Sequence, residues 1–310
     1  MFVSVIIPTY NRLPILQKCL RALEQQVFTT ISYDYEVVVV DDGSTDGTIS
    51  WLNSNIYKFP HVQLLEQIHG GPAEARNLGV EKSKGDVIVF IDSDLVVKPS
   101  FIENHLELLI SSWERRGNRK TFTYGTVINT ANFENPTSEP YKFNDFSWAY
   151  FATGNVAIDK SILEKAGLFD TSFRLYGWED LELGERLRRM DVRLIKCPKA
   201  VGYHWHPALT MDQINDLIRV EKERAKMGLI FFKKHPTRRV RFIIQFTFLH
   251  RLLWELLTFG GLLNPRTLRP LLSLLIRKGY QSWAMEILRL PLNLLGVREI
   301  YRKAAEMGLK

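Results

Sequence analysis

The sequence predicts an α/β fold built on a mostly parallel sheet and followed by a helical extension. In the first hundred residues, short apolar runs alternate with amphipathic helical patterns, as in proteins whose strands are joined by helices. Polar clusters follow three of these runs, at 9–12, 41–48 and 92–94, and the pattern beyond residue 210 is almost wholly helical. We therefore expect a sheet with helices on both faces and a helical part at the carboxyl-terminal end.

The individual elements follow from the positions of apolar residues. Residues 37–40 are four consecutive valines, which is typical of a strand covered on both faces. Leucines at helical spacing predict a helix over 13–26, and a proline in the first turn favours a second helix over 72–82. Further strands are expected at 3–7, where Pro8 ends the strand, at 62–65 and at 87–91. Ligands of such sheets bind beyond the carboxyl ends of the strands, so the three polar clusters should share one crevice.

The positive charge of the chain is concentrated at one end. The net charge is +7, and residues 233–310 carry 15 Lys+Arg against 4 Asp+Glu, whereas the preceding part is slightly acidic. This asymmetry predicts an anionic partner for the basic end. Two cysteines, Cys19 and Cys197, and no secretory signal indicate a reducing, cytoplasmic setting.

The turn that begins with Asp41 and Asp42 follows the valine strand and contains two glycines. A carboxylate in this place can accept a hydrogen bond from the imide N–H of a nucleobase, and Gly43 and Gly47 let the turn pass close to a planar ring. The alternative is a polar turn that only caps the next helix.

The triplet Asp92-Ser93-Asp94 ends the strand at 87–91. Alternate residues of an extended segment present both carboxylates to one side, and oxygen ligands suit Mg²⁺ or Mn²⁺. His204 and His206 follow an expected strand that starts near residue 200, so both imidazoles should lie on one side, and one of them can be a third ligand. Purely structural histidines are the alternative.

Two helix starts carry further candidates. Arg76 lies one turn into the helix that begins at Pro72, where it can reach a phosphate or a base, or be a surface arginine. Asp180 lies in the first turn of a helix next to Trp178, an aromatic that can stack on a sugar. Because helix N-termini favour ionised carboxylates, Asp180 should be charged at neutral pH. The alternative is an ordinary acidic helix start.

Together the motifs resemble those of the family-2 glycosyltransferases, which have a GT-A fold, over roughly residues 2–210. The resemblance is carried, in the family's order, by Val-Ser-Val-Ile-Ile-Pro-Thr-Tyr-Asn-Arg, Asp-Asp-Gly-Ser-Thr-Asp-Gly-Thr, Gly-Gly-Pro-Ala-Glu-Ala-Arg-Asn-Leu-Gly, Asp-Ser-Asp and Glu-Asp. The fold implied is a Rossmann-like nucleotide-binding mixed sheet with helices on both faces. We divide the chain into a catalytic domain, 1–232, with donor and acceptor halves at 1–98 and 99–232, and a basic amphipathic helical extension, 233–310.

The resemblance also implies roles for individual residues in an inverting, metal-dependent transfer of a hexosyl or hexosaminyl group from a nucleotide-sugar. Asp180 is the implied general base, and Asp94, Asp92 and His204, with His206 less favoured, are the implied ligands of Mn²⁺ or Mg²⁺. The implied acceptor side is formed by Gly154, Asn155, Trp178 and Glu179. The donor, expected to be a UDP-sugar with GDP and dTDP left open, is expected to contact Pro8, Thr9, Tyr10, Asn11, Arg12, Asp41, Asp42, Arg76, Asp92 and Ser93. One departure is His69, where many relatives have a small polar residue.

The helical extension interleaves apolar runs with basic residues, as in the segment 242–249 that precedes Arg251. A membrane-spanning helix needs about 20 apolar residues, and Arg251 and Glu255 interrupt this candidate. An amphipathic helix lying on the anionic inner surface of the cytoplasmic membrane fits better, with a glycan or lipid-linked acceptor in cell-envelope polysaccharide or glycolipid synthesis. The alternative is a helical cap on the catalytic domain or on a sister subunit of a homo-oligomer.

The sequence disfavours two rival functions. A nucleotidyltransferase usually opens with a glycine-rich basic loop, which residues 8–11 do not provide. A non-enzymatic membrane or nucleic-acid adaptor would use the basic tail, but strand-end carboxylates repel phosphates unless a cation intervenes, so we expect no nucleic-acid partner.

Overall fold

The computed structural model describes residues 1–30, 33–142, 145 and 149–309, and these form two compact units. The first unit consists of residues 1–174 and 179–206, and the second of residues 175–178 and 207–310. The boundary expected at residue 232 lies within helix α7 (Ile214–Lys234) and stays a prediction.

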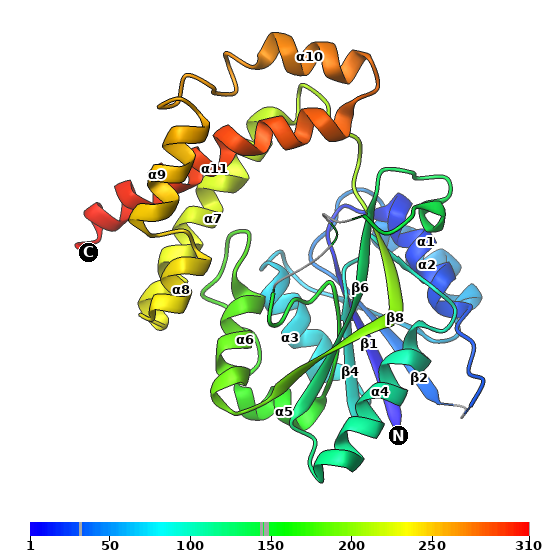
Figure 1. The fold of residues 1–310 in the computed structure, drawn as a ribbon. Coiled ribbons are helices and arrows are strands. Elements are labelled where there is room, and N and C mark those ends of the chain that lie inside the picture. The colour runs from blue at the N-terminus through cyan, green and yellow to red at the C-terminus, as the bar shows by residue number, and fades with distance from the viewer. Residues whose placement is uncertain (31–32, 143–144, 146–148, 310) are drawn as a thin grey trace. The chain divides into compact units, whose positions relative to one another are not determined.

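The first unit is built on one mixed sheet of eight strands in the order β3-β2-β1-β4-β7-β6-β8-β5 (Figure 1). The strands β3, β2, β1 and β4 run parallel to one another, whereas β7 is antiparallel to both β4 and β6. The α/β class is thus confirmed, and the expected donor half supplies the four strands that are parallel to one another, while β6 and β8 form a further parallel pair. The strands are β1 (Phe2–Thr9), β2 (Asp34–Asp41), β3 (Val62–Glu66), β4 (Val87–Ile91), β5 (Leu95–Val97), β6 (Thr121–Thr130), β7 (Asn155–Asp159) and β8 (Arg193–Trp205).

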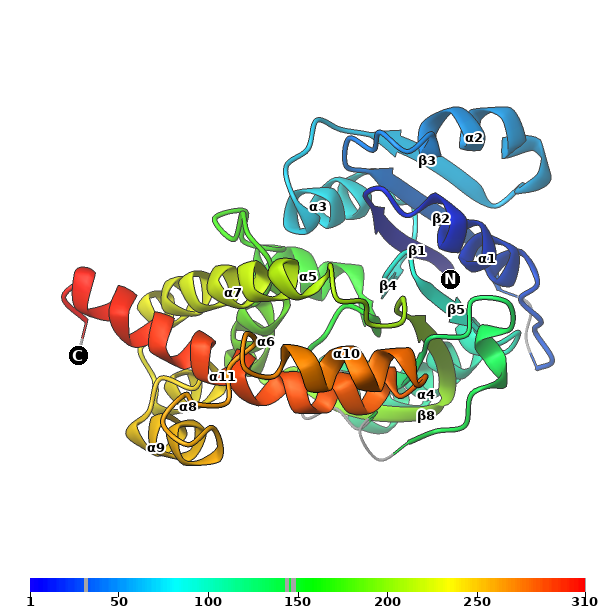
Figure 2. The same cartoon turned by 90° about the horizontal axis from the view of Figure 1, so that it is seen from above.

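Helices cover both faces of this sheet, as the sequence predicts (Figure 2). One face packs against α1 (Leu13–Glu24), α2 (Thr48–Asn55) and α4 (Phe101–Arg116). The opposite face packs against α3 (Pro72–Lys82), α5 (Lys160–Ala166) and α6 (Glu179–Arg189), and two short 3₁₀ helices lie at η1 (Ile56–Lys58) and η2 (Pro136–Ser138). The valine strand shows why: Val37 and Val39 enter one core while Val38 and Val40 enter the other.

Two expected element ends are corrected by the structure. β1 does not stop at Pro8 but continues to Thr9, which pairs in register with Asp41 of β2. Pro8 is tolerated because it lies beyond the stretch Val3–Ile6 that pairs with β4, close to the end of the strand. The helix predicted over 13–26 ends at Glu24.

A glycine fixes how closely α3 approaches the sheet. A Cβ built on Gly79 would lie 2.5 Å from a methyl carbon of Ile6 in β1, which is shorter than any van der Waals contact. Because glycine has no Cβ, the helix can lie directly on the strand. This close packing fixes the helix that carries Arg76 beside the carboxyl ends of the strands.

The second unit is helical, as expected for the end of the chain. Its core is formed by apolar residues that include Leu209, Leu272, Ala284 and Leu288. None of its helices, nor any other helix among the described residues, is long and apolar enough to cross a membrane. The helices are α7 (Ile214–Lys234), α8 (Arg238–Ile243), α9 (Phe248–Leu257), α10 (Arg269–Arg277) and α11 (Gln281–Glu306).

Candidate active site

The loop that follows β1 is held against the turn that follows β2. The backbone N–H of Asn11 donates to Ser44 Oγ over 2.9 Å, and Thr45 N–H donates to Asn11 Oδ1 over 2.7 Å. Asn11 adopts a φ of 52°, a left-handed conformation that asparagine tolerates better than most residues. The two polar clusters at 9–12 and 41–48 are therefore in direct contact, as the sequence predicts.

Asp42 organises the neighbouring loop rather than facing an open site. Its carboxylate accepts hydrogen bonds from Gln67 Nε2 at 2.6 Å and from the backbone N–H groups of Gly70 and Gly71 at 2.8 and 2.9 Å. His69 Nδ1 lies 2.9 Å from the same carboxylate. These donors occupy the carboxylate that the resemblance assigns to the nucleotide. Sequence analysis flagged His69 only as a departure and missed Gln67, because neither belongs to a motif.

Asp41 and Thr9 retain polar atoms without partners. They are register partners at the ends of β2 and β1, and both are buried. Asp41 Oδ1 accepts from Ser44 N–H over 2.7 Å, but Asp41 Oδ2 and Thr9 Oγ1 have no hydrogen-bond partner among the residues that the structure describes. Since a buried polar atom without a partner is costly, this pair is a better candidate than Asp42 for contact with a ligand.

Tyr10 and Arg12 extend from the β1 loop in two directions. The ring of Tyr10 stacks on His69, with ring centroids 4.3 Å apart, and Tyr10 is 44% exposed. Arg12 Nη1 lies 3.3 Å from Asp94 Oδ2. The three-residue loop thus links the Asp42 cluster to the Asp94 cluster.

Asp94, His204 and His206 form a cluster whose ligand atoms all lie within 4.8 Å of one another. β5 and β8 pair beside it, and His204 Nε2 lies 2.8 Å from Asp94 Oδ1. Burial disfavours both charged forms, but this hydrogen bond outweighs it, so the pKa of Asp94 is lowered and that of His204 raised. The two imidazoles lie on one side, with centroids 4.1 Å apart.

This donor set fits a divalent ion. One carboxylate and two imidazoles suit Mn²⁺ better than Mg²⁺, which prefers oxygen ligands alone. His206, which the sequence favours less than His204, also has a ring nitrogen within reach of the cluster. Asp92 instead forms an ion pair with Arg76, whose Nη2 lies 3.1 Å from Asp92 Oδ1. Ser93, the residue between Asp92 and Asp94, is buried.

Arg76 connects the strand ends to the first turn of α6. Its side chain is 7% exposed, and its Nη1 lies 2.9 Å from Glu179 Oε1. It is therefore not the surface arginine of the alternative hypothesis. Glu179, expected on the acceptor side, is buried, and its second oxygen Oε2 has no hydrogen-bond partner within the described part of the chain.

Asp180 follows Glu179 directly and is partly buried. Burial and the adjacent Glu179 carboxylate raise the pKa of Asp180 to about 7, although Arg76 and the backbone N–H of Leu181 act in the opposite direction. The sequence predicts a fully ionised carboxylate from its place at a helix N-terminus. Here desolvation outweighs that effect, which corrects the expectation.

Gly154 and Asn155, both expected on the acceptor side, differ in their surroundings. A Cβ on Gly154 would lie 3.1 Å from Asp92 Oδ2, so the absence of a side chain leaves room for that carboxylate. Asn155 is fully buried; its Nδ2 donates to the carbonyls of Thr126 and Ala200, both at 3.0 Å, and its Oδ1 lies 2.8 Å from His105 Nε2. Both N–H groups of its amide are used within the protein, so Asn155 holds β6, β7 and β8 together instead of donating to an acceptor.

His105, which sequence analysis missed, lies in the middle of α4 and has no motif around it. Its Nδ1 lies 2.8 Å from Thr123 Oγ1. Because Asn155 Nδ2 donates to two carbonyls, its Oδ1 must accept from His105 Nε2–H, which fixes the neutral tautomer. Burial lowers the pKa of His105 to about 4.

Trp178 belongs to the helical unit, not to the sheet unit. Its Nε1–H donates to the carbonyl of Arg224 over 2.7 Å, and the Arg224 guanidinium lies 5.3 Å from the centre of its ring. The indole also packs near Phe231 of α7, with centroids 6.3 Å apart. The Trp178 ring, which was expected to stack on a sugar, thus contacts Arg224 and Phe231 of α7.

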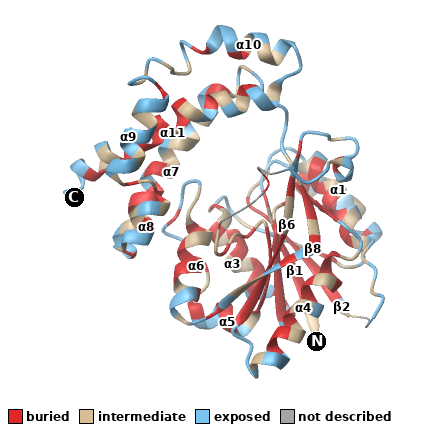
Figure 3. Cartoon of the chain, in the orientation of Figure 1, coloured by how far each residue is buried: buried red, intermediate tan, exposed pale blue. Residues whose placement is uncertain are grey.

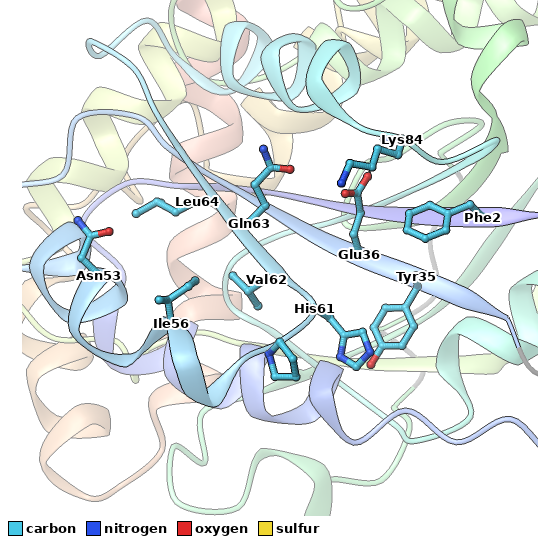
Figure 4. A pocket seen from close by; sticks show the side chains of 11 residues that line it. Phe2, Tyr35, Glu36, Asn53, Ile56, His61, Val62, Gln63, Leu64 and Lys84 are labelled. Carbon is cyan, nitrogen blue, oxygen red and sulfur yellow. The ribbon is translucent and has the colours of Figure 1, made fainter.

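A separate open hollow of 590 Å³ lies beside the edge strand β3 (Figure 4). It is lined by the first residues of β1, β2 and β3, whereas the site residues follow the carboxyl ends of these strands. Two of its ionisable side chains are engaged within the protein: His61 Nδ1 lies 2.7 Å from Glu24 Oε2, and Glu36 accepts from Ser4 Oγ and from the backbone N–H of Lys84. We assign no chemistry to this hollow.

The sheet order, the strand-end carboxylates and the helices on both faces define a GT-A fold. Among solved structures, the chain is similar to the mannosyltransferase PcManGT from Pyrobaculum calidifontis, in complex with GDP-Man and Mn²⁺. The TM-score is 0.62 at 22% identity, covering 97% of this chain and 87% of the other. TarS 1–349 of S. aureus, in complex with UDP, gives 0.52 at 17% identity, covering 98% and 92%.

The profile of glycosyl transferase family 2 matches residues 4–167, and the chain belongs to this family. It is 30% identical over 241 residues to the chondroitin synthase of Escherichia coli, which covers 66% of this chain and 34% of the synthase. It is also 30% identical over 206 residues to the glycosyltransferase AglE of Haloferax volcanii, covering 66% of each. The chain thus spans about a third of the synthase. Family membership favours sugar transfer over the nucleotidyltransferase and adaptor hypotheses.

Proposed function

We propose that this chain transfers a hexosyl or hexosaminyl group from a nucleotide-sugar to an acceptor hydroxyl, with inversion at the anomeric carbon. The contact between Arg76 and Glu179 carries the proposal, because it joins the start of α6 to the strand end at Asp92. A base candidate, Asp180, follows Glu179 and lies close enough to Asp92 for their charges to interact. Base and donor-site carboxylates thus lie at the same end of the sheet.

Asp180 acts as the general base. It takes the proton from the acceptor hydroxyl while the oxygen attacks the anomeric carbon on the face opposite the nucleotide, and the bond to the diphosphate breaks. A pKa of about 7 suits this task, because a base with a pKa near the working pH combines ionisation with proton affinity. Glu179 holds Arg76 rather than the acceptor.

Asp94, His204 and His206 would hold the divalent ion, which neutralises the charge growing on the departing diphosphate when it is bound. The hydrogen bond with His204 lowers the pKa of Asp94 most, and Arg12, whose Nη1 lies near Oδ2 of Asp94, lowers it further. We favour Mn²⁺ because two of the three donors are nitrogen atoms.

The β1 loop and the β2 turn bind the nucleotide. Asp41 Oδ2 is the acceptor for the imide N–H of the base, Thr9 Oγ1 is a neighbouring polar contact, and the exposed ring of Tyr10 provides a stacking surface. Pro8 and Asn11 shape this loop, and Asp42 fixes the loop 67–71 beside it. A UDP-sugar is the proposed donor, and GDP- and dTDP-sugars are the alternatives.

The acceptor is a glycan or a lipid-linked glycan at an anionic membrane surface, and the protein works as a peripheral protein on the cytoplasmic side. The excess of 15 basic over 4 acidic residues in 233–310 supports this part of the proposal. Gly154 marks the acceptor side, since it is the small residue next to Asp92. Association of copies through the helical unit is the competing use of this basic region.

A donor panel tests the proposal. Thermal unfolding is measured with Mn²⁺ and UDP, GDP or dTDP, and hydrolysis of the corresponding nucleotide-sugars is followed without acceptor. We expect UDP with Mn²⁺ to raise the melting temperature and one UDP-sugar to be hydrolysed slowly. A chain that no nucleotide stabilises and that hydrolyses no donor would rule out the transferase.

A further inference from the structure

Helix α9 presents an apolar stripe to solvent instead of to the protein core. Leu249, Leu252, Leu253 and Leu256 recur at the spacing of one helical face. All four are exposed, Leu249 by 64% and Leu256 by 66%, and no residue of α9 is buried. Figure 3 shows α9 largely in the colour of exposed residues. An ordinary surface helix turns such a stripe inward.

The two charged residues of α9 contact α11. Arg298 donates two hydrogen bonds to the carboxylate of Glu255, at 2.9 and 2.7 Å. The guanidinium of Arg251 lies 5.2 Å from the centre of the Tyr301 ring. The two charges that interrupt the apolar run in the sequence are therefore used within the helical unit. The outward face is left with leucines.

The turn after α9 continues this apolar surface. Phe259 is 68% exposed and Leu262 is 73% exposed. Phe259 has a φ of 51°, in the left-handed region where a bulky side chain is strained, and Gly260 and Gly261 follow with positive φ. Strained backbone is often retained where it serves a function, and here it places a large apolar ring in water.

The segment of sequence that contains this surface is strongly basic. Residues 235–282 contain eight Lys or Arg and one Asp or Glu, and that one acid, Glu255, is already paired. Arg238, Arg266 and Arg269, which flank α9 in the sequence, are exposed. An apolar stripe flanked by exposed arginines is the pattern of a helix that lies in the headgroup region of an anionic bilayer.

We propose that the leucine face of α9, together with Phe259 and Leu262, inserts into the surface of an anionic lipid bilayer. The inference rests on the membrane part of the proposed function and names the surface that makes the contact. The occupant is lipid rather than protein because the surface combines unspecific apolar side chains with a net positive charge. The arginines attract the anionic headgroups, and the leucines and the ring replace water by acyl chains.

Vesicle flotation tests this surface. The full chain is mixed with phosphatidylcholine vesicles, with or without phosphatidylglycerol, and the bound fraction is measured against salt. We expect binding to the anionic vesicles only, weakened by salt. The double variant Leu249→Ser/Leu256→Ser should lose affinity by about tenfold or more. Phe259→Asn should also weaken binding, because asparagine fits the left-handed backbone and removes only the ring.

A matched control removes a similarly exposed ring elsewhere. Tyr57, which is 74% exposed in the first unit, is changed to serine and should leave vesicle binding unchanged. Equal binding by the wild type and the double variant would overturn the proposal. A second outcome would also overturn it: the wild type does not bind vesicles and is a dimer, whereas the double variant is a monomer. The leucine face would then be the contact with a second copy of the chain.

Donor hydrolysis in solution separates this inference from the proposed function. The α9 variants should hydrolyse the nucleotide-sugar at the wild-type rate, because none of the changed residues lies in the sheet unit. Vesicle binding without any hydrolysis would remove the transferase and keep the docking surface. Hydrolysis without vesicle binding would support the transferase and rule out the docking surface.

Discussion

Arg76 Nη1 lies 2.9 Å from Glu179 Oε1, although the two residues are 103 positions apart in the chain. Both side chains are less than a tenth exposed, and the same guanidinium also reaches Asp92. This bridge is the contact that brings the first turn of α6 to the carboxyl end of β4. The position of Asp180 depends on it.

Breaking this bridge should destabilise the fold. Arg76→Met leaves Glu179 buried without its partner, and we expect a loss of about 3 kcal/mol in the free energy of unfolding. Arg76→Met/Glu179→Met should recover most of that loss, because both charges are then gone. Urea unfolding measures both. The exposed pair of Arg219 and Asp216 is the control, and Arg219→Met should change nothing measurable.

Asp180→Asn should abolish turnover while donor binding persists. The amide keeps the shape of the side chain but cannot take a proton, so we expect the rate of sugar transfer to fall by a factor on the order of 10²–10⁴. Calorimetry with UDP and Mn²⁺ should give the wild-type affinity. Asp191→Asn, an exposed change just beyond the same helix, is the control. Wild-type turnover in the Asp180 variant would exclude this residue as the base.

The rate should depend on pH through Asp180. Because burial and Glu179 raise its pKa to about 7, the base becomes protonated and inactive as the pH falls through that value. We expect kcat/KM to be flat above pH 7 and to fall about tenfold per unit below it. Glu179→Gln removes the neighbouring negative charge and should shift the midpoint to lower pH. An acid limb that stays in place in this variant would contradict the assigned cause.

Both histidines of the cluster should contribute to metal affinity. His204→Ala and His206→Ala each remove one nitrogen donor, and we expect Mn²⁺ to bind about tenfold more weakly or worse in either variant when UDP is present. Calorimetry gives the affinities, and His250→Ala in the helical unit is the control. If His206→Ala bound Mn²⁺ as the wild type does, His206 would not be a ligand.

The buried His105 should make stability depend on pH. Its pKa is about 4 in the folded chain and about 6.5 unfolded, so between these values the unfolded state binds more protons. The contribution of neutral His105 to the free energy of unfolding is therefore fully present above pH 6.5. It falls by about 2 kcal/mol between pH 7 and pH 5. Urea unfolding at both values should show this loss in the wild type and a smaller one in His105→Gln. Equal losses would show that other groups cause it.

The sequence was a good guide wherever the evidence was local. The four valines of β2, the leucine stripe of α1 and the proline at the start of α3 each depend on neighbours along the chain, and the structure has all three elements. The acceptor half could not be divided in this way. There β6, β7 and β8 pair across long stretches of sequence. The thirteen residues of β8 show no regular alternation of buried and exposed positions, so its place in the sheet depends on strands that are distant in the sequence.

The sequence by itself determined the family, the parallel donor half and the set of polar residues at the strand ends, because repeating apolar spacing and ordered motifs are properties of a linear chain. Only the tertiary structure decided which of those residues are free to act. In the folded chain Asp42 accepts hydrogen bonds from the loop 67–71, Asn155 contacts His105, and His206 lies beside Asp94. Hydrogen bonding and desolvation depend on groups that are distant in the chain and adjacent in space, so they exist only once the chain has folded.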